Sequence, residues 1–110
     1  MNVEGVWKVE LLGPYGWESL STAFIENGRY LSASQDHYTL GRYEVDGDRI
    51  RVVARIHTHA EALDPAADPA GREFGFEGQF SDAQISGQAD DSAAQQSITL
   101  RGTRLGGLSA

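Results

Sequence analysis

Alternation of apolar and polar residues is the feature that most constrains the fold of this chain. In residues 3–11 the odd positions hold Val, Gly, Trp, Val and Leu, whereas positions 4, 8 and 10 are charged. Side chains of a β-strand point alternately to its two faces, so this period of two is typical of a half-buried strand. The same alternation recurs in residues 50–56, 74–80 and 98–100. No segment has the period of a long amphipathic helix, and we therefore predict an all-β fold.

Turn-forming residues divide the chain at short intervals. They occur at residues 13–16, Asn27-Gly28, 34–36, Asp46-Gly47, 60–71, Ser81-Asp82 and 90–96. Asn-Gly and Asp-Gly supply the positive φ angles that two-residue hairpin turns require. About eight strands at such regular spacing favour a sandwich or an antiparallel up-and-down barrel. We predict the barrel, as a single domain over residues 1–110.

An up-and-down barrel would separate these connections into two groups. The tight turns at 27–28, 46–47 and 81–82 gather at one end, and the mostly longer connections at 13–16, 34–37, 60–71 and 90–96 gather at the other. Such a barrel is closed at one end and has a mouth at the other. Small-molecule sites of β-barrels usually lie in that mouth.

The charge balance and the lack of cysteine argue against several classes of protein. Sixteen Asp and Glu against nine Lys and Arg give a net charge of −7, which disfavours direct binding to nucleic acid. The chain contains no cysteine, so disulfides and Cys-based zinc sites are excluded. No signal-peptide pattern begins the sequence, and no apolar run approaches the roughly 20 residues of a membrane helix. We therefore expect a cytoplasmic protein without a membrane partner.

The first strand begins with Gly5-Val6-Trp7. This tripeptide resembles the Gly-x-Trp signature of lipocalin-like and avidin-like barrels. The resemblance implies that Trp7 plugs the closed end and that a basic residue of the last strand packs across it. Arg104 shares the parity of Ile98 and Leu100 near the end of the last strand, so it is the first candidate for this barrel-closing role, with Arg101 second.

A narrower resemblance covers about half of the chain. Residues 5–7, 24–28 and 41–50 read GVW, FIENG and GRYEVDGDRI, and together they resemble the GrlR-type negative regulators of type III secretion. The resemblance implies a bacterial, dimeric, lipocalin-like barrel that binds and sequesters a transcriptional activator. An acidic hairpin tip carries that recognition in the family. The matching turn, residues 45–48, keeps Asp46 and Asp48 as the expected partner-binding residues and has Val and Gly at the other two positions.

Three histidines could form a metal site. His57 and His59 share one face of a strand, a spacing that some zinc and copper sites use, and His37 is the candidate third ligand. A two-residue turn at Asp46-Gly47 would place His37 opposite Ile56 on the apolar side, away from the other two imidazoles. A three-residue loop would reverse this arrangement. We predict no metal site.

The same register predicts contacts on the outer face. It pairs Glu44 with Arg49 as a cross-strand ion pair and sets Arg42 opposite Arg51. Further along, it pairs Leu40 with Val53 and Tyr38 with Arg55. The side chains of Tyr38, Leu40 and Val53 would then form a small exposed apolar patch, which is a candidate homodimer contact.

Motifs of hydrolytic catalysis do not occur. The chain has neither a Gly-x-Ser-x-Gly elbow nor a glycine-rich phosphate loop. Ser, His and Asp are present without a spacing that links them, and the acidic pairs lie in turns. We therefore predict a non-enzymatic protein with no catalytic residue and no cofactor.

Inward-pointing residues define a lumen. The candidates for lining it or for contacting a ligand are Trp7, Val9, Leu11, Tyr43, Ile50, Val52, Phe74 and Phe76. Eight strands enclose a space that side chains fill or that one small ligand occupies, and the several aromatic residues favour a packed core. Two functions stay open: a regulatory, protein-binding module that sequesters a transcriptional activator, or a carrier of a small apolar ligand.

Overall fold

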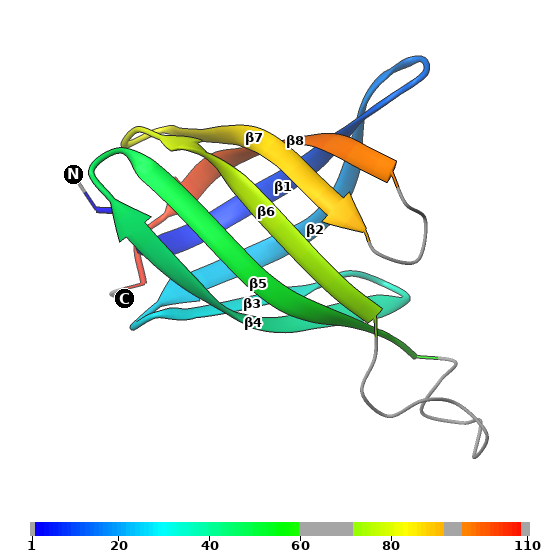
Figure 1. Ribbon diagram of the computed structural model, residues 1–110, viewed down its shortest axis with the longest axis horizontal. Helices are drawn as coiled ribbons and strands as arrows, with labels where there is room; N and C mark the ends of the chain where they lie inside the picture. Colours follow the sequence, from blue (N-terminus) through cyan, green and yellow to red (C-terminus); the bar gives the residue numbers. More distant parts are fainter. Residues whose placement is uncertain (1, 60–71, 92–95, 109–110) are drawn as a thin grey trace.

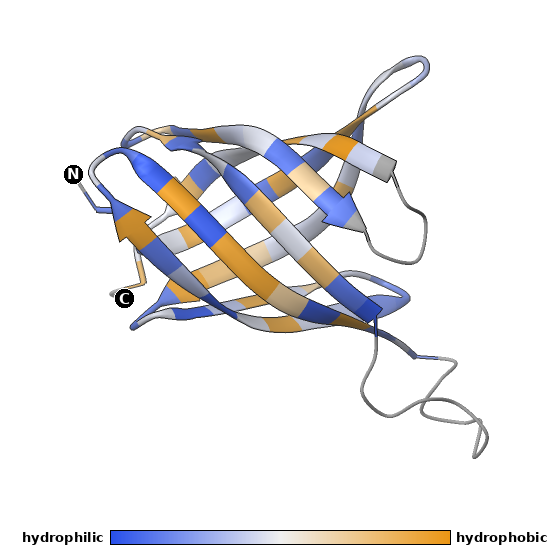
Figure 2. Ribbon diagram, in the orientation of Figure 1, coloured by the Kyte–Doolittle hydropathy of each residue, from blue (hydrophilic) through white to orange (hydrophobic). Residues whose placement is uncertain are grey.

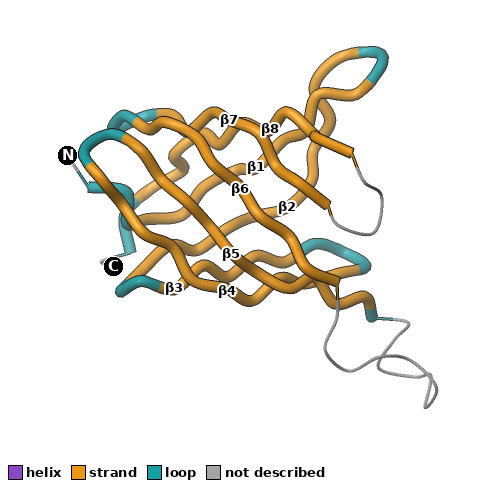
Figure 3. The backbone as a smooth tube through the Cα atoms, in the orientation of Figure 1, coloured by secondary structure: helices purple, strands orange, loops and turns teal. Residues whose placement is uncertain are grey.

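The computed structural model describes residues 2–59, 72–91 and 96–108. Eight antiparallel strands form one closed barrel in which each strand pairs with its neighbours in sequence and β8 pairs with β1 (Figure 1). The strands are β1 (Gly5–Gly13), β2 (Gly16–Glu26), β3 (Arg29–Ala33), β4 (His37–Asp46), β5 (Arg49–Thr58), β6 (Arg72–Phe80), β7 (Gln84–Asp91) and β8 (Gln96–Gly106). Figure 3 shows the described chain as strands and loops. The predicted fold class, an eight-stranded lipocalin-like up-and-down barrel, is thereby confirmed.

Alternation decides which face of each strand is buried. In β5, Ile50, Val52 and Ala54 are buried, whereas Arg51 and Val53 between them are exposed. Figure 2 shows the hydropathy of successive residues along β5. Because the inner faces of all eight strands meet inside the barrel, they form one apolar core, and no helix of the described residues covers it. Among the described residues no helix is long and apolar enough to cross a membrane.

The connections separate into two ends, as predicted. The turns β2–β3, β4–β5 and β6–β7 lie at the end that also holds both chain termini (Figure 1, left). Asn27 and Gly28 have φ angles of 51° and 77°, so this dipeptide supplies the two positive φ angles of a type I′ hairpin turn. The opposite end carries the β1–β2 and β3–β4 connections. The predicted long connections at 60–71 and 90–96 lie wholly or in part outside the described residues.

The hairpin between β4 and β5 corrects the predicted register. Asp46 pairs with Arg49, so the two-residue turn is Gly47-Asp48 and not Asp46-Gly47. Gly47 has a φ of 61° and Asp48 has no positive φ, which is the pattern of a type II′ turn with glycine at its first position. The shift amounts to two residues and therefore keeps every side chain on its predicted face.

New cross-strand neighbours follow on the outer face. The pairs are Tyr38 with His57, Leu40 with Arg55, Arg42 with Val53 and Glu44 with Arg51. The predicted pairs are therefore wrong: Arg42 with Arg51, Glu44 with Arg49, Leu40 with Val53 and Tyr38 with Arg55. Arg51 instead forms an ion pair with Glu77 of β6, with 3.3 Å between Nε and Oε1.

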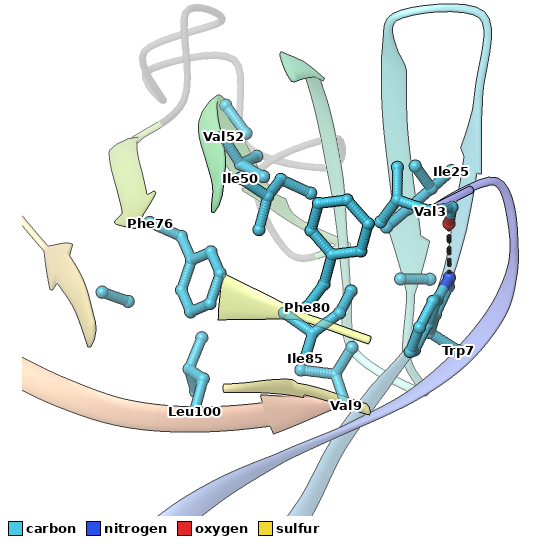
Figure 4. Packing of buried hydrophobic residues seen from close by; sticks show 13 residues of the cluster. Val3, Trp7, Val9, Ile25, Ile50, Val52, Phe76, Phe80, Ile85 and Leu100 are labelled. Carbon is cyan, nitrogen blue, oxygen red and sulfur yellow. Dashed lines mark hydrogen bonds between the residues drawn. The ribbon is translucent and has the colours of Figure 1, made fainter. Parts of the chain in front are cut away.

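Trp7 plugs the end of the barrel near the termini. Its side chain has no exposed surface and packs beside Val3 and Ile25 (Figure 4). The indole Nε1 donates a 2.9 Å hydrogen bond to the carbonyl oxygen of Val3, so the one polar atom of the ring has a partner. The guanidinium carbon of Arg104 lies 4.5 Å from the centroid of the Trp7 ring, which is the arrangement that the Gly-x-Trp resemblance implied.

Arg104 also fastens three segments of the closed end. Its Nη1, Nη2 and Nε atoms donate hydrogen bonds to the carbonyl oxygens of Glu4, Asn2 and Asp82. A Cβ atom on Gly5 would lie 2.5 Å from Nη1, and the φ of Gly5 is +151°. Glycine is therefore required there because the guanidinium occupies the space that a side chain would fill.

Arg101, the second candidate for the closing role, lies on the outer face instead. Its guanidinium carbon is 4.1 Å from the centroid of the Trp17 ring, and its Nε donates a 3.1 Å hydrogen bond to Oε1 of Glu10. In the β1–β8 pairing, Val6 pairs with Gly106 and Trp7 pairs with Arg104, so Leu105 of β8 is the extra residue of a bulge next to Arg104.

Arg104→Lys should lower the free energy of unfolding by about 1.5–3 kcal/mol, the scale of a lost hydrogen bond to a charged group. The ammonium group of lysine cannot donate hydrogen bonds to three carbonyl oxygens that are arranged around a planar guanidinium group. Urea denaturation followed by circular dichroism measures the change. Arg42→Lys on the outer face is the matched control and should change stability by less than about 0.5 kcal/mol. Equal stabilities of the two variants would contradict the fastening role of Arg104.

Candidate functional site

The interior of the barrel contains two separate spaces along its length. A void of about 40 Å³ lies in the core and is lined by residues such as Trp7, Val9 and Val52. A larger cavity of about 300 Å³ lies at the other end, the mouth. Its lining comprises Leu11, Leu20, Asp36, His37, Ile56, Thr58, Arg72, Phe74, Ile98 and Leu100. The barrel is therefore packed next to Trp7 and open at the mouth.

The lumen candidates from the sequence divide between these spaces. Trp7, Val9, Ile50, Val52 and Phe76 line the small void, and Phe74 lines both the void and the mouth cavity. Leu11 lines the mouth cavity, whereas Tyr43 packs against the core without lining either space. Most of the residues predicted to contact a ligand therefore line the small void in the core and not the mouth cavity.

Leu20 reaches the mouth because of a β-bulge in β2. Val9 pairs with Ser21 and Glu10 pairs with Ser19, so Leu20 is the extra residue of the bulge. A bulge of this kind can redirect a side chain that strict alternation would place elsewhere. The sequence interpretation missed Leu20 because a bulge leaves no mark in the alternation itself.

Arg72 lines the mouth from the first position of β6. It lies opposite Ile56, which is on the inner face of β5. The alternation of Phe74, Phe76 and Phe80 continues to Arg72 if it is extended by two residues toward the N-terminus. This signal could have identified Arg72, and the sequence interpretation did not use it.

The β3–β4 connection forms a hydrogen-bonded cluster at the rim of the mouth. His37 Nδ1 lies 2.9 Å from Oδ1 of Asp36, and the Ser34 hydroxyl donates a 3.1 Å hydrogen bond to the same carboxylate. Hydrogen bonds from His37 and Ser34 hold the pKa of Asp36 below its usual value. The amide of His59 donates to the carbonyl oxygen of Asp36, so the rim is also tied to the end of β5.

This cluster brings together one serine, one histidine and one aspartate, which the sequence interpretation had not linked. Both Ser34 Oγ and Asp36 Oδ1 make their closest contacts with the same ring nitrogen of His37, Nδ1. A nucleophile–base–acid relay uses the two ring nitrogens separately. The geometry therefore supports a rigid rim around the cavity and not a relay.

The remaining histidines lie on the outer face of the barrel. The His57 ring stacks on Tyr38 with 5.0 Å between centroids, and the His59 ring lies 6.3 Å from the same tyrosine. His37 is on the inner side, as predicted, but it pairs with Thr58 and not with Ile56. Within the described part of the chain, no three His, Cys, Asp or Glu side chains are placed to hold a metal ion.

Asp46 and Asp48, the expected partner-binding residues, are both exposed at the β4–β5 hairpin. Asp46 lines an open surface depression of about 400 Å³ together with Glu44, Val45, Arg49, Ile50, Arg51 and Glu77. Asp48 is not part of that lining. The depression holds charges of both signs, so the hairpin end is a mixed rather than a purely acidic surface.

An apolar surface covers the outer face of the neighbouring strands. Phe24, Leu31 and Leu40 lie side by side on β2, β3 and β4, because Phe24 pairs with Leu31 and Leu31 pairs with Leu40. Phe24, Leu40, Val53 and Tyr38 are between 37% and 55% exposed. We call Phe24, Leu31, Tyr38, Leu40 and Val53 the outer apolar surface. It contains the three residues of the smaller patch predicted from the sequence.

Tyr30 is a titratable group in the core and lines the small void. Burial raises its pKa to about 12, against a lowering effect of a hydrogen bond with Ser32. In the unfolded chain the phenol loses its proton near pH 10. Between pH 10 and 12 the unfolded state is therefore stabilised by deprotonation while the folded state is not.

The free energy of unfolding should consequently fall by about 2–3 kcal/mol more in the wild type than in Tyr30→Phe as the pH rises from 10 to 12. Chemical denaturation at a series of pH values measures the difference. Tyr15 is 99% exposed, so Tyr15→Phe should keep the wild-type pH profile. A Tyr30→Phe profile that coincides with the wild type would show that this phenol titrates normally.

Comparison with known proteins adds no relative. No protein-family model matches the chain, and neither a curated protein nor a solved structure matches it. The fold and the site therefore define the class of protein by themselves. It is a small, closed, lipocalin-like β-barrel with a packed core and a cavity at its mouth.

Proposed function

We propose that this protein is a non-enzymatic binding module that holds a small apolar molecule in its barrel mouth. The cavity of about 300 Å³ carries this proposal. Its volume falls at the lower end of the range of small-molecule pockets, roughly 300–1,000 Å³. Six of its ten lining residues, Leu11, Leu20, Ile56, Phe74, Ile98 and Leu100, are apolar. Burial of an apolar ligand against such side chains is favourable by about 25 cal/mol per Å² of apolar surface.

Calorimetric titration with 1-octanol tests this function. The wild type should bind octanol, and Leu20→Trp should weaken binding because the larger side chain takes up part of the mouth cavity. Leu12 of β1 is 47% exposed on the outside and does not line the cavity, so Leu12→Trp is the matched control that should bind like the wild type. The proposal is wrong if the wild type binds no octanol, or if Leu20→Trp binds it unchanged.

As a second candidate, we propose a regulatory role in a bacterial cytoplasm, in which the protein sequesters a transcriptional activator. The exposed hairpin tip favours it, since Asp46 and Asp48 project into solvent where a partner can reach them. The open depression beside Asp46 adds a concave surface. The resemblance to GrlR-type regulators supplies the kind of partner. Both roles can coexist, because the hairpin and the mouth lie at opposite ends of the barrel (Figure 1).

Affinity purification from the native organism followed by mass spectrometry tests the second candidate. A transcriptional activator should be recovered with the wild type and lost with the double variant Asp46→Ala/Asp48→Ala. Asp82 is an exposed aspartate in another tight turn at the same end, so Asp82→Ala should recover the activator normally. Recovery that does not depend on the hairpin aspartates contradicts the proposal.

The outer apolar surface supports assembly into a homodimer. Four of its five residues are between 37% and 55% exposed, and contiguous exposed apolar patches commonly mark interaction sites. Sedimentation equilibrium should give twice the mass of the chain for the wild type and the mass of one chain for Leu40→Asp. Leu12→Asp, at an equally exposed leucine outside this surface, should remain dimeric. A monomeric wild type would contradict the dimer.

A further inference from the structure

The mouth cavity has two chemically different walls. Among the described residues, its polar lining consists of Asp36 in the β3–β4 connection and of His37, Thr58 and Arg72 on the consecutive strands β4, β5 and β6. The strands β5 and β6 also contribute the apolar Ile56 and Phe74. On β8, β1 and β2, also consecutive, the lining residues are all apolar: Leu11, Leu20, Ile98 and Leu100. In a closed barrel of eight strands these two groups of strands face each other. A ligand in the mouth therefore meets a wall that carries all the described polar groups on one side, which we call the polar wall, and a wholly apolar set of described side chains on the other.

The polar wall favours an anionic group. Arg72 brings a permanent positive charge, and its guanidinium matches the geometry of a carboxylate. Thr58 adds a hydroxyl. It pairs with His37 of β4 and lies two residues after Ile56, the residue of β5 that pairs with Arg72. Arg72 and Thr58 also have partners within the protein. A guanidinium has five N–H donors and can serve such a partner and a ligand at the same time.

Among the described residues of the lining, Asp36 is the one acidic residue, and it does not cancel this preference. The side chain of Asp36 is 89% exposed, whereas that of His37 is 21% exposed. The Asp36 carboxylate accepts the Ser34 hydroxyl and lies 2.9 Å from His37 Nδ1, so it is held on the solvent side of the imidazole. Water screens the charge of Asp36 and also that of Arg72, which is exposed as well. The preference therefore rests on the planar guanidinium of Arg72, which can bind a carboxylate directly through two N–H groups, whereas Asp36 is held on the solvent side of His37.

We infer that the ligand is an amphipathic carboxylate, with its anionic end on the β4–β6 wall at Arg72 and its apolar part against Leu11, Leu20, Ile98 and Leu100. This inference rests on the proposed ligand-binding function and adds the chemical class of the ligand. The apolar wall supplies affinity for the chain, and Arg72 selects the head group.

Three probes with the same eight-carbon chain and different head groups test the inference: octanoate, 1-octanol and octylammonium. Calorimetry at neutral pH should show that the wild type binds octanoate at least fivefold more tightly than octanol, and octylammonium most weakly. Arg72→Gln should remove the preference for octanoate and leave the affinity for octanol within twofold of the wild type. Arg42→Gln makes the same change of charge on the outer face and should keep the preference.

The outcomes separate the inference from the function beneath it. If none of the three probes binds, the ligand-binding function fails and the inference fails with it. If octanol binds and octanoate binds no better, the mouth is an apolar site without head-group selection, and only the inference is wrong. An unchanged preference in Arg72→Gln would likewise overturn the assigned role of this arginine.

Discussion

Trp7→Ala is expected to lower the free energy of unfolding by about 3–5 kcal/mol. The side chain is completely buried at the closed end, and its removal leaves a cavity beneath Arg104 and an unused carbonyl at Val3. Domains of this size are stable by only about 5–15 kcal/mol. The variant should therefore unfold at a much lower urea concentration, as followed by far-ultraviolet circular dichroism.

The chain holds a matched control for this change. Trp17 is the only other tryptophan, and it is 37% exposed on the outer face under Arg101. Trp17→Ala should cost about 1 kcal/mol, the scale of an exposed cation–π contact. Trp7→Phe should be intermediate, because it keeps most of the ring volume and loses the hydrogen bond. Similar losses for Trp7→Ala and Trp17→Ala would show that the closed end does not depend on its plug.

Gly87→Ala is expected to cost about 3 kcal/mol or more, at the upper end of overpacking effects. Gly87 pairs with Gly78 where β6 and β7 approach closely. A Cβ atom at Gly87 would lie 2.1 Å from the carbonyl oxygen of Glu77 and 2.5 Å from the Cα of Gly78. Both are backbone atoms of a paired strand, so neither can move without breaking the ladder of hydrogen bonds. Thermal and urea unfolding both measure the loss.

Gly75→Ala is the control for this second change. Gly75 lies in β6, and nothing is within 4 Å of the position that its Cβ would take. Because alanine has less backbone freedom than glycine in the unfolded chain, Gly75→Ala should be neutral or stabilising by up to about 1 kcal/mol. A Gly87→Ala variant as stable as Gly75→Ala would mean that the two strands separate easily at this point.

The glycines show how far sequence reasoning reaches. Glycine inside a strand is typical of a close approach or a bend, and three such glycines are at positions 41, 78 and 102. A Cβ at Gly41 would lie 2.4 Å from the Cβ of Ala54, and one at Gly78 would lie 2.2 Å from the carbonyl oxygen of Ser86. At Gly102 the nearest atoms are 3.5 Å away, which is ordinary contact. The sequence identifies the three strand glycines, whereas the distances between the strands show at which of them a larger residue would not fit.

The candidate site was less predictable than the fold. Of its lining, the sequence interpretation named Leu11 and Phe74 as ligand candidates and placed His37 on the inner side. It missed Leu20, which a bulge turns inward, and Arg72, which pairs with Ile56 across two strands. A bulge and a cross-strand pair each depend on a second strand, so neither can be read from the residues of one strand alone.

The resemblance to Gly-x-Trp barrels implied the partnership of Trp7 with Arg104. The sequence by itself determined the all-β fold, the face that β1, β5, β6 and β8 each bury, and the grouping of the tight turns at one end. These features follow from local alternation, turn chemistry and chain order, which the residues specify directly. Only the tertiary structure decided the register of the β4–β5 hairpin, because type I′ and type II′ turns accept the same Asp-Gly-Asp segment with different pairings. It also decided that the core is filled beside Trp7 and open at the mouth, because a cavity depends on how side chains from eight strands fill a common volume.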